Sequence, residues 1–334
     1  MTTTHRTVER ETAAARAPLV RRGMSECRLC AFRCGVDRRS GPAGTCRSDA
    51  VSRIFYEGIE WAGEDGLVPT YVVSLSGCNL SCSFCLTGDS SQDGRAGIPL
   101  DPDALAARIC ARTPQLRSVT LLGGEPSIHL DGALEIAARV PRSLPFVWKT
   151  NAYASPEALA LLEGVPDVVL ADYKFGNDLC AGRLARVPRY TEVVRANLLW
   201  AHRLSRLVVR HLLMPGHVEC CFAGVAAWLV NELPEAPLSL MTGYLPVHRA
   251  ATDAVLGRTN RGDECRRALE IVRSRGLRTV PWTLAPSVGP PTAPVEGRPD
   301  EIWIDREGRI CVDSASRELV AALRRLGEGF APNV

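Results

Sequence analysis

The sequence predicts an α/β fold built on a parallel sheet, with small segments appended at both ends. Short apolar runs typical of buried strands alternate with helical patterns between residues 71 and 275. Helices that connect successive strands are the crossovers that parallel sheets require. At 334 residues the chain can hold one α/β domain of about 200 to 250 residues together with these appendages.

Residues 67–284 form the expected domain, with a Cys-rich segment and an extension before it. Polar residues 1–25, rich in Arg and Thr, are expected to be a disordered or weakly helical extension. Residues 26–66 are rich in Gly and Cys and have no apolar core of their own, so a bound metal is expected to fold them. The expected strands are 71–76, 118–122, 146–150, 167–171, 207–213 and 238–242. The expected helices are 102–112, 130–139, 156–163, 190–204, 218–231 and 263–275.

The last fifty residues read as a linker followed by a small unit. Residues 285–300 are rich in proline and are expected to lack regular structure. Residues 301–334 contain two β runs joined through Asp305–Gly308, which predicts a hairpin, and then a helix from about 316 to 326.

Composition excludes several classes of function. The net charge of +3 and the lack of a basic tract interleaved with aromatic residues argue against a nucleic-acid partner. No apolar run approaches 18 residues and the N-terminal residues lack the apolar stretch of a secretion signal, so we expect a cytoplasmic protein without a membrane partner. Thirteen cysteines, many at ligand spacings, indicate metal thiolates rather than disulfides.

Cys78, Cys82 and Cys85 have the spacing C-x3-C-x2-C in a loop after the first expected strand. Three thiolates on one loop can hold three irons of a cubane [4Fe–4S] cluster and leave the fourth iron without a protein ligand. A zinc knuckle or a ferredoxin-type cluster is the alternative. Both normally need a fourth ligand nearby, and neither explains the LLGGEPS segment that follows the next expected strand.

In that segment, Gly123 and Gly124 allow a close approach of the backbone to a ligand, and Glu125 can accept a hydrogen bond from an ammonium group. The apolar strand, the three-cysteine loop and GGEP together resemble the radical S-adenosylmethionine (SAM) superfamily. This resemblance implies a partial (β/α)6 barrel. It also implies that SAM chelates the open iron and, with an electron from a reductant such as flavodoxin or ferredoxin, is cleaved to a 5′-deoxyadenosyl radical. Gly123, Gly124 and Glu125 are then expected to bind its amino group.

Residues at the ends of later strands extend the expected SAM site, because parallel α/β proteins bind ligands there. Asp172 and Lys174 form a D-x-K pattern that resembles activases of glycyl-radical enzymes, which implies that Lys174 meets the SAM carboxylate. Arg210 matches a strand-end arginine of the same proteins. A surface ion pair is the alternative for the D-x-K pair. His211, beside Arg210, is a candidate catalytic residue, with a structural histidine as the alternative.

Lys149 marks a departure from the activase pattern. The activases have D-T-N-G where this chain has K-T-N-A at 149–152, and their aspartate helps to bind a small cation near the SAM carboxylate. We predict that Lys149 supplies that positive charge or faces an anionic substrate, and that Asn151 belongs to the SAM site. Only Lys149 and Lys174 are lysines among 40 basic residues, which suggests a GC-rich genome and a need for an amine at both positions. The alternative is that both lysines remain by chance on the solvated surface and have no specific role.

Cys27, Cys30, Cys34 and Cys46 suit a tetrahedral zinc or an auxiliary iron–sulfur cluster. Their spacing resembles the N-terminal region of pyruvate formate-lyase activating-like proteins, and a regulatory or vestigial set is the alternative. The other cysteines are expected to be packing or structural residues, namely Cys110, Cys180, Cys220, Cys221, Cys265 and Cys311. Tyr244 and His248 are expected to be exposed to substrate.

Three functions are compatible with these residues. The first is a radical SAM enzyme that abstracts hydrogen from an anionic sugar or nucleoside, with a resemblance to lyases of cytosylglucuronate-decarboxylase type in antibiotic biosynthesis. The second is an activase that acts on a glycine of a partner enzyme. The third is an iron–sulfur or zinc interaction protein without enzymatic activity.

Overall fold

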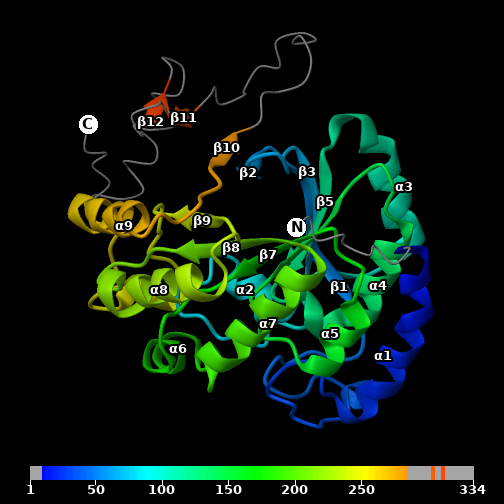
Figure 1. The fold of residues 1–334 in the computed structure, drawn as a ribbon. Coiled ribbons are helices and arrows are strands. Elements are labelled where there is room, and N and C mark those ends of the chain that lie inside the picture. The colour runs from blue at the N-terminus through cyan, green and yellow to red at the C-terminus, as the bar shows by residue number, and fades with distance from the viewer. Residues whose placement is uncertain (1–9, 285–301, 305–309, 313–334) are drawn as a thin grey trace. The chain divides into compact units, whose positions relative to one another are not determined.

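The computed structural model describes residues 10–284, 302–304 and 310–312 (Figure 1). Its main sheet has eight strands in the order β4-β1-β3-β5-β6-β7-β8-β9. Six consecutive strands are parallel: β3 (Thr70–Leu75), β5 (Ser118–Gly123), β6 (Phe146–Thr150), β7 (Val168–Asp172), β8 (Arg206–Leu212) and β9 (Leu238–Met241). They confirm the predicted α/β fold and the six strands of a partial barrel. The edge next to β3 carries two antiparallel strands that were not predicted, β1 (Arg53–Glu60) and β4 (Ile98–Pro99).

Helices connect the parallel strands, and their first residues explain where several begin. They are α3 (Pro102–Arg112), α4 (Leu130–Arg139), α5 (Pro156–Leu162), α6 (Asp178–Ala185), α7 (Tyr190–Leu204), α8 (Ala223–Glu232) and α9 (Gly262–Ser274), with one turn α2 (Gly88–Ser91). Asp101 accepts hydrogen bonds from two backbone N–H groups of α3, and Ser155 accepts one from the N–H of Ala158 in α5; a proline follows each cap. Of these, α6 and α2 were not predicted.

Short helical turns complete the connections. The 3-10 turns are Arg10–Arg16, Met24–Glu26, Arg38–Ser40, Thr113–Gln115, Pro126–His129 and His248–Thr252, and a π-helical turn, Val218–Phe222, leads into α8. The helix expected from 218 to 231 therefore begins with one wide turn before it becomes an α-helix.

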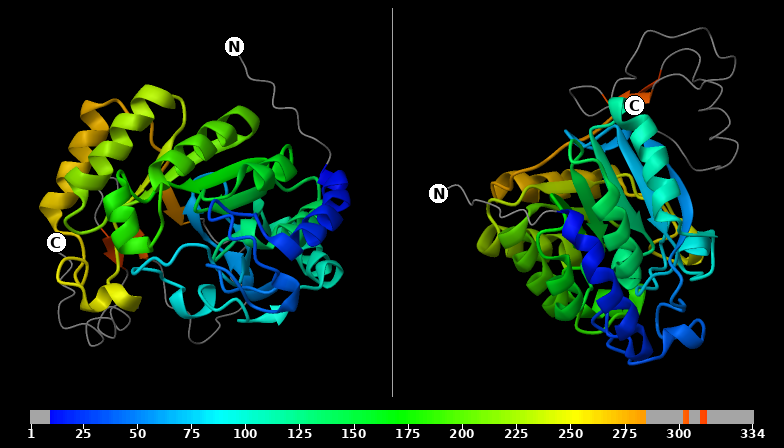
Figure 2. Two further views of the ribbon diagram at one scale, coloured as in Figure 1. Left: turned by 90° about the horizontal axis from the view of Figure 1, so that it is seen from below. Right: turned by 90° about the vertical axis from the view of Figure 1, so that its right-hand side faces the viewer.

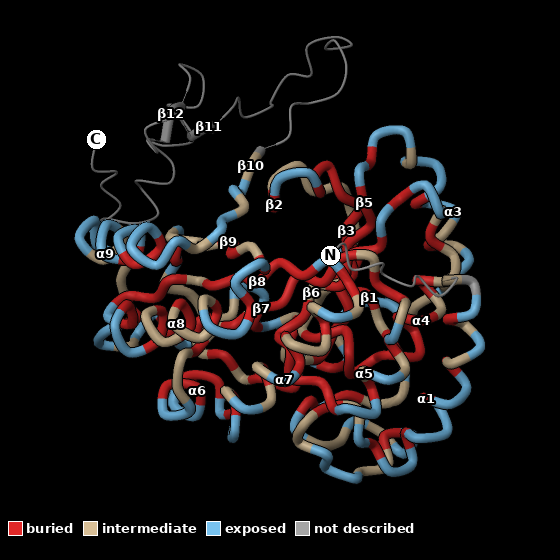
Figure 3. Tube along the Cα trace, in the orientation of Figure 1, coloured by how far each residue is buried: buried red, intermediate tan, exposed pale blue. Residues whose placement is uncertain are grey.

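Two apolar layers cover the two faces of the curved sheet, and the strands are buried along most of their length (Figure 3). The inner layer is small and contains Val147 of β6, Val168 and Leu170 of β7, and Val208 of β8. Side chains alternate between the faces of a strand. Lys149, two residues after Val147, therefore shares the inner face of the barrel.

The N-terminal segment corrects one expectation. Residues 10–23 form a 3-10 helix and α1 (Ala17–Gly23), which lies beside α4, as Figure 1 and the two views of Figure 2 show. Ala13, Ala17 and Val20 are buried, and Arg21 pairs with Asp131 and Glu135 of α4. These apolar residues are spaced at helical intervals within a polar segment, so residues 10–25 are packed helix and not a disordered extension. Residues 1–9 lie outside the described part.

At the other end of the barrel domain, β10 (Trp282–Leu284) pairs with β2 (Ala62–Glu64). A separate hairpin is formed by β11 (Ile302–Ile304) and β12 (Ile310–Val312), as the β runs predict. The linker at 285–300 and the helix expected from 316 to 326 lie outside the described residues. Among the helices of the described residues, none has the length and apolar character needed to cross a bilayer.

Candidate active site

The three-cysteine loop follows β3 and is fixed by contacts with α6. The backbone N–H of Ser81 donates to the carbonyl of Ala185 at 3.0 Å, and that of Ser83 donates to Leu184 at 2.8 Å. Between the cysteines, Leu80 and Phe84 are buried, and Phe84 packs edge-on against Phe175. The cysteine side chains therefore extend from a backbone whose shape is set by the barrel domain.

The donor set of this loop fits an iron–sulfur cluster. Cys82 is buried, whereas Cys78 and Cys85 are partly exposed. Burial raises the pKa of the Cys82 thiol to about 12, so iron must displace the proton when it binds the thiolate. Three thiols on one short loop can bind three irons of a cubane cluster and leave the fourth iron without a protein ligand.

The GGEP segment packs directly against this loop. Gly124 donates its backbone N–H to Leu75 at 2.9 Å, and Glu125 donates to Gly77 at the same distance. A Cβ atom at Gly124 would lie 1.9 Å from the carbonyl oxygen of Gly77, and one at Gly123 would lie 2.0 Å from that of Leu75. The lack of a side chain at these glycines thus allows the GGEP backbone to pack against the backbone at the end of β3 and the start of the cysteine loop.

Glu125 is completely buried and accepts three hydrogen bonds from its own chain. The donors are the hydroxyl of Thr150 at 2.8 Å, the N–H of Asn151 at 2.7 Å and the N–H of Ser127 at 3.1 Å. Burial raises the pKa of Glu125, and these three donors oppose the rise. An ammonium group bound here would share the carboxylate with these donors.

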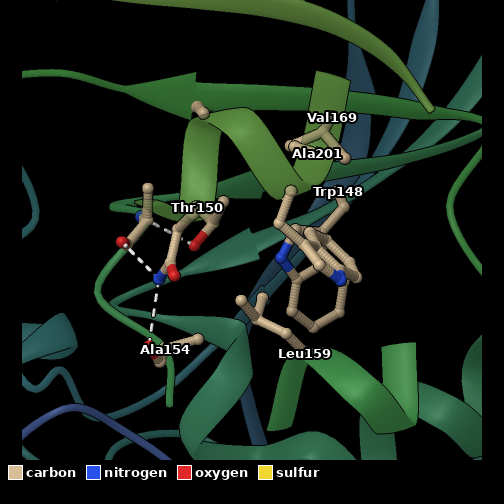
Figure 4. A pocket seen from close by; sticks show the side chains of 10 residues that line it. Trp148, Thr150, Ala154, Leu159, Val169 and Ala201 are labelled. Atoms are coloured by element: carbon tan, nitrogen blue, oxygen red, sulfur yellow. Dashed lines mark hydrogen bonds between the residues drawn. The ribbon is translucent and has the colours of Figure 1, made fainter. Parts of the chain in front are cut away.

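Asn151 connects the end of β6 to the cysteine loop. Its side-chain amide donates to the side-chain oxygen of Asn79 at 2.7 Å and approaches the sulfur of Cys78 at 3.7 Å. The backbone beyond it is held from outside the sheet, where Asn197 of α7 donates to Ala152 and Ala154 at 2.8 and 3.0 Å (Figure 4). The predicted SAM residues Glu125 and Asn151 and the predicted iron ligand Cys78 therefore lie together.

The apolar hollow in Figure 4 is lined by residues such as Trp148, Leu159 and Val169 and lies between the sheet and α5 and α7. It contains none of the predicted site residues. We interpret it as a packing gap of the outer core.

A buried ion-pair network occupies the ends of β7 and β8. Asp172 accepts from Lys174 at 2.6 Å and from Arg210 at 2.8 Å, and Arg210 also pairs with Glu64 of β2 at 2.5 Å. Burial acts to raise the pKa of Asp172, but Lys174 and Arg210 outweigh it and hold the pKa at about 2. The Asp172–Lys174 pair is therefore part of the barrel interior and not a surface ion pair.

Glu64 was not identified from the sequence, because it lies in a three-residue strand and its partner Arg210 is 146 positions away. It also accepts from the hydroxyl of Ser239 of β9 at 3.1 Å. Glu64 thus connects the segment before β3 to the last two parallel strands.

Lys149 is half-buried on the inner face and lies in the field of this network. Burial and the neighbouring Arg210 lower its pKa to about 8, while Glu64 and Asp172 oppose the change. Within the described residues, its ammonium group has no hydrogen bond and no ion pair within 4 Å.

The remaining candidates, His211, Tyr244 and His248, differ in burial and in their contacts. His211 is buried, its Nδ1 donates to the carbonyl of Tyr173 at 2.7 Å, and its ring packs against Phe222, so it occupies a structural position on the face opposite Arg210. Tyr244 is buried with its hydroxyl on a backbone carbonyl, and the expectation that it is exposed to substrate is wrong. His248 is partly exposed and lines a surface hollow beside Cys85.

In the Cys-rich segment, Cys27, Cys30 and Cys46 are buried and Cys34 is exposed. Arg38, which has no exposed surface, approaches the sulfur of Cys27 at 3.8 Å. A tetrahedral zinc site and an auxiliary iron–sulfur cluster formed by these four cysteines both stay predictions.

Comparison with known proteins agrees with the site. The profile of the Radical SAM superfamily matches residues 72–229, which include the three-cysteine loop and GGEP. An uncharacterized protein of Methanocaldococcus jannaschii is 31% identical over 259 residues, which cover 75% of this chain and 75% of that protein. The chain belongs to the radical SAM superfamily. As in that superfamily, a [4Fe–4S] cluster and S-adenosylmethionine are its cofactors.

Other similarities of this radical SAM protein are shorter or more distant. The 7-carboxy-7-deazaguanine synthase of Bacteroides thetaiotaomicron is 36% identical over 84 residues, which cover 25% of this chain and 42% of the synthase. SuiB of Streptococcus suis, solved with its precursor peptide SuiA, has a TM-score of 0.46 and 11% identity. That match covers 61% of this chain and 46% of SuiB, so the chain spans about half of its length. A radical SAM methyltransferase of Sphaerobacter thermophilus has a TM-score of 0.47 at 17% identity, over 64% of this chain and 66% of the methyltransferase.

Proposed function

We propose that this protein abstracts a hydrogen atom from an anionic small molecule whose negative group binds Lys149. The cluster is assigned to Cys78, Cys82 and Cys85. Bound SAM supplies a 5′-deoxyadenosyl radical when the cluster is reduced. The chain's own residues bind, orient and enclose the reactants.

The observation that carries the proposal is the ammonium group of Lys149 on the inner face of the barrel, which has no ion-pair partner among the residues that the structure describes. Among the charged groups that act on Lys149, Glu64, Asp172 and Glu60 are carboxylates and Arg210 is a cation. Asp172 and Glu64 are already engaged by Lys174 and Arg210. A carboxylate of the substrate would give Lys149 a close partner of opposite charge.

The SAM site in this proposal consists of Gly123, Gly124, Glu125 and Asn151 for the amino end and Lys174 for the carboxylate. Arg210 was expected to contact SAM directly. Its pairs with Glu64 and Asp172 instead support a positioning role, in which Arg210 holds Asp172 against Lys174.

The specific substrate that we propose is a uronic-acid nucleoside of the cytosylglucuronate type, which would lose its carboxylate in antibiotic biosynthesis. Two observations support a carboxylated small molecule. One is the single cation without a partner among the charged groups described above. The other is the partial similarity to a synthase named for a carboxylated product.

A second candidate is an activase of the pyruvate formate-lyase activating type, which acts on a glycine of a partner enzyme. The observation that favours it is the D-x-K pair, which forms a partly buried 2.6 Å ion pair at the end of β7. A reductant protein such as flavodoxin or ferredoxin would serve both candidates.

The test uses anaerobically reconstituted protein with SAM, a reductant and cytosylglucuronate, and follows 5′-deoxyadenosine and carbon dioxide. We expect both products to exceed the buffer control and to fall together in Lys149→Met. No increase over buffer with this substrate would remove the specific substrate. A glycyl-radical electron paramagnetic resonance signal in a candidate partner enzyme would favour the activase. Absence of 5′-deoxyadenosine under strong reductant would favour the interaction protein without enzymatic activity.

A further inference from the structure

A second group of metal-ligating side chains lies outside the candidate active site. Cys180 belongs to the first turn of α6, whereas His217 and Cys220 lie at the π-helical turn before α8. One donor atom of each residue lies within 4.8 Å of the others, and no other group of three such residues does so among the described residues. We propose that these three side chains bind one divalent ion that prefers thiolate and imidazole, such as Zn²⁺. Cys180 and Cys220 would then be metal ligands and not the packing and structural residues expected from the sequence.

The spacing of the two sulfurs matches such an ion. The sulfurs of Cys180 and Cys220 are 3.9 Å apart. Two thiolates bound to zinc at about 2.3 Å with tetrahedral angles are about 3.8 Å apart. The ion can therefore bind between them without a rearrangement of the backbone.

His217 is oriented as a metal ligand. Its Nδ1 lies 2.7 Å from the carbonyl oxygen of Pro215, so Nδ1 carries the proton and Nε2 has the free electron pair. Donation of the other ring N–H to a carbonyl is the arrangement that fixes metal-binding histidines. In the structure, Nε2 accepts from the guanidinium group of Arg183 at 3.0 Å. Arg183 is exposed, so it can move into water when the ion takes its place.

Asn177 contacts both cysteines of this group. Asn177, which caps α6, donates its side-chain amide to the sulfur of Cys180 at 3.4 Å and to the carbonyl of Cys220 at 2.5 Å. Cys220 is exposed, so water can complete the coordination of the ion. The neighbouring Cys221 is buried, and its sulfur lies 3.8 Å from the side-chain amide of Asn177.

The site would tie the loop after β7 to the start of α8. Gly176 follows Lys174 by two positions, and a Cβ atom there would lie 2.2 Å from the carbonyl oxygen of Cys221. An ion held by Cys180, His217 and Cys220 would fasten the two segments at this point of close contact. Its role is therefore structural, and it does not depend on the proposed substrate.

The test compares zinc and iron per chain in anaerobically purified full-length protein and in Cys180→Ser, Cys220→Ser and His217→Ala. We expect each variant to lose about one zinc per chain with iron unchanged, whereas Cys110→Ser, at an exposed isolated cysteine, keeps both. If the purified protein lacks zinc, titration with Zn²⁺ gives the same comparison. Arg183→Ala should bind Zn²⁺ several-fold more tightly, because it removes the group that competes for His217.

Two results would overturn the proposal. One is equal zinc binding in the wild type, Cys180→Ser, Cys220→Ser and His217→Ala. The other is a Cys180–Cys220 disulfide in the anaerobically purified protein. Since Cys220 is exposed, its variant is expected to fold, and circular dichroism checks this before the metal is measured.

Discussion

Arg210 offers a quantitative test of the ion-pair network at the ends of β7 and β8. Its side chain is 9% exposed and bridges Glu64, which is 5% exposed, and Asp172. Arg210→Met keeps most of the side-chain volume but leaves the buried carboxylate of Glu64 without its cation and removes one of the two cations that pair with the partly buried Asp172. Removal of one member of a buried ion pair costs about 3–5 kcal/mol of the free energy of unfolding. At about 2–4 °C per kcal/mol, we expect the melting temperature to fall by roughly 10 °C.

A double variant separates the charge effect from lost packing. Arg210 and Lys149 outweigh burial and hold the pKa of Glu64 below its ordinary value. Glu64→Gln removes the orphaned charge, so the combined variant should be less destabilised than the sum of the single variants by about 1–3 kcal/mol. The pair stabilises the fold above the ordinary glutamate pKa and loses this effect as the pH falls. Arg210→Met should therefore show a weaker loss of stability on acidification.

The assay is anaerobic thermal unfolding followed by tryptophan fluorescence. The control is Arg278→Met, because Arg278 forms an exposed pair with Glu235 and its loss should change stability by at most about 1 kcal/mol. If Arg210→Met destabilises the protein no more than Arg278→Met, or if the two changes at Arg210 and Glu64 are additive, the buried network does not hold these strands together.

Three further predictions concern single positions. With an anionic substrate, Lys149→Met should raise KM about 10- to 100-fold, since a charge-assisted hydrogen bond contributes about 1.5–3 kcal/mol. The wild-type KM should rise above pH 8, where Lys149 loses its proton, and Lys149→Arg should lack this rise; a pH-independent wild-type KM would contradict the assignment. Gly124→Ala, whose Cβ would lie 1.9 Å from Gly77, should lose most cluster iron after reconstitution, whereas Gly182→Ala, which meets no atom within 4 Å, should retain it; equal iron in both would refute the close packing. Tyr244→Phe should lose about 1 kcal/mol of stability, because it removes one hydrogen bond, and should keep kcat. A large loss of kcat would show that Tyr244 takes part in the reaction.

The elements that the sequence predicted well are those with strong periodicity. The bounds of α3, α4, β6 and α7 coincide with the expected residues, because continuous apolar runs and amphipathic helices leave little choice of period. By contrast, β1 is an almost wholly half-buried strand near the sheet edge, so neither alternation nor a continuous apolar run marked it. The packed helix α1 was not predicted, because its few buried apolar residues lie among polar residues in the sequence.

The candidate site was predictable where its residues are close in the sequence. The cysteine loop and GGEP each form a local motif, and their contact follows from the pairing of β3 with β5. The network around Glu64 and the group around Cys180 depend on contacts between segments more than 35 residues apart, which no local pattern encodes. That His211 faces away from Arg210's side of the sheet was predictable, because successive side chains of a strand such as β8 point to opposite faces.

The central claim is that Cys78, Cys82 and Cys85 hold the cluster that cleaves SAM. It is tested most directly by measuring 5′-deoxyadenosine formed from SAM under strong reductant in reconstituted wild type and in the variant with all three cysteines changed to alanine. We predict that the wild type forms 5′-deoxyadenosine and that the triple variant forms none above buffer. Equal formation by both proteins would contradict the assignment of the cluster to this loop.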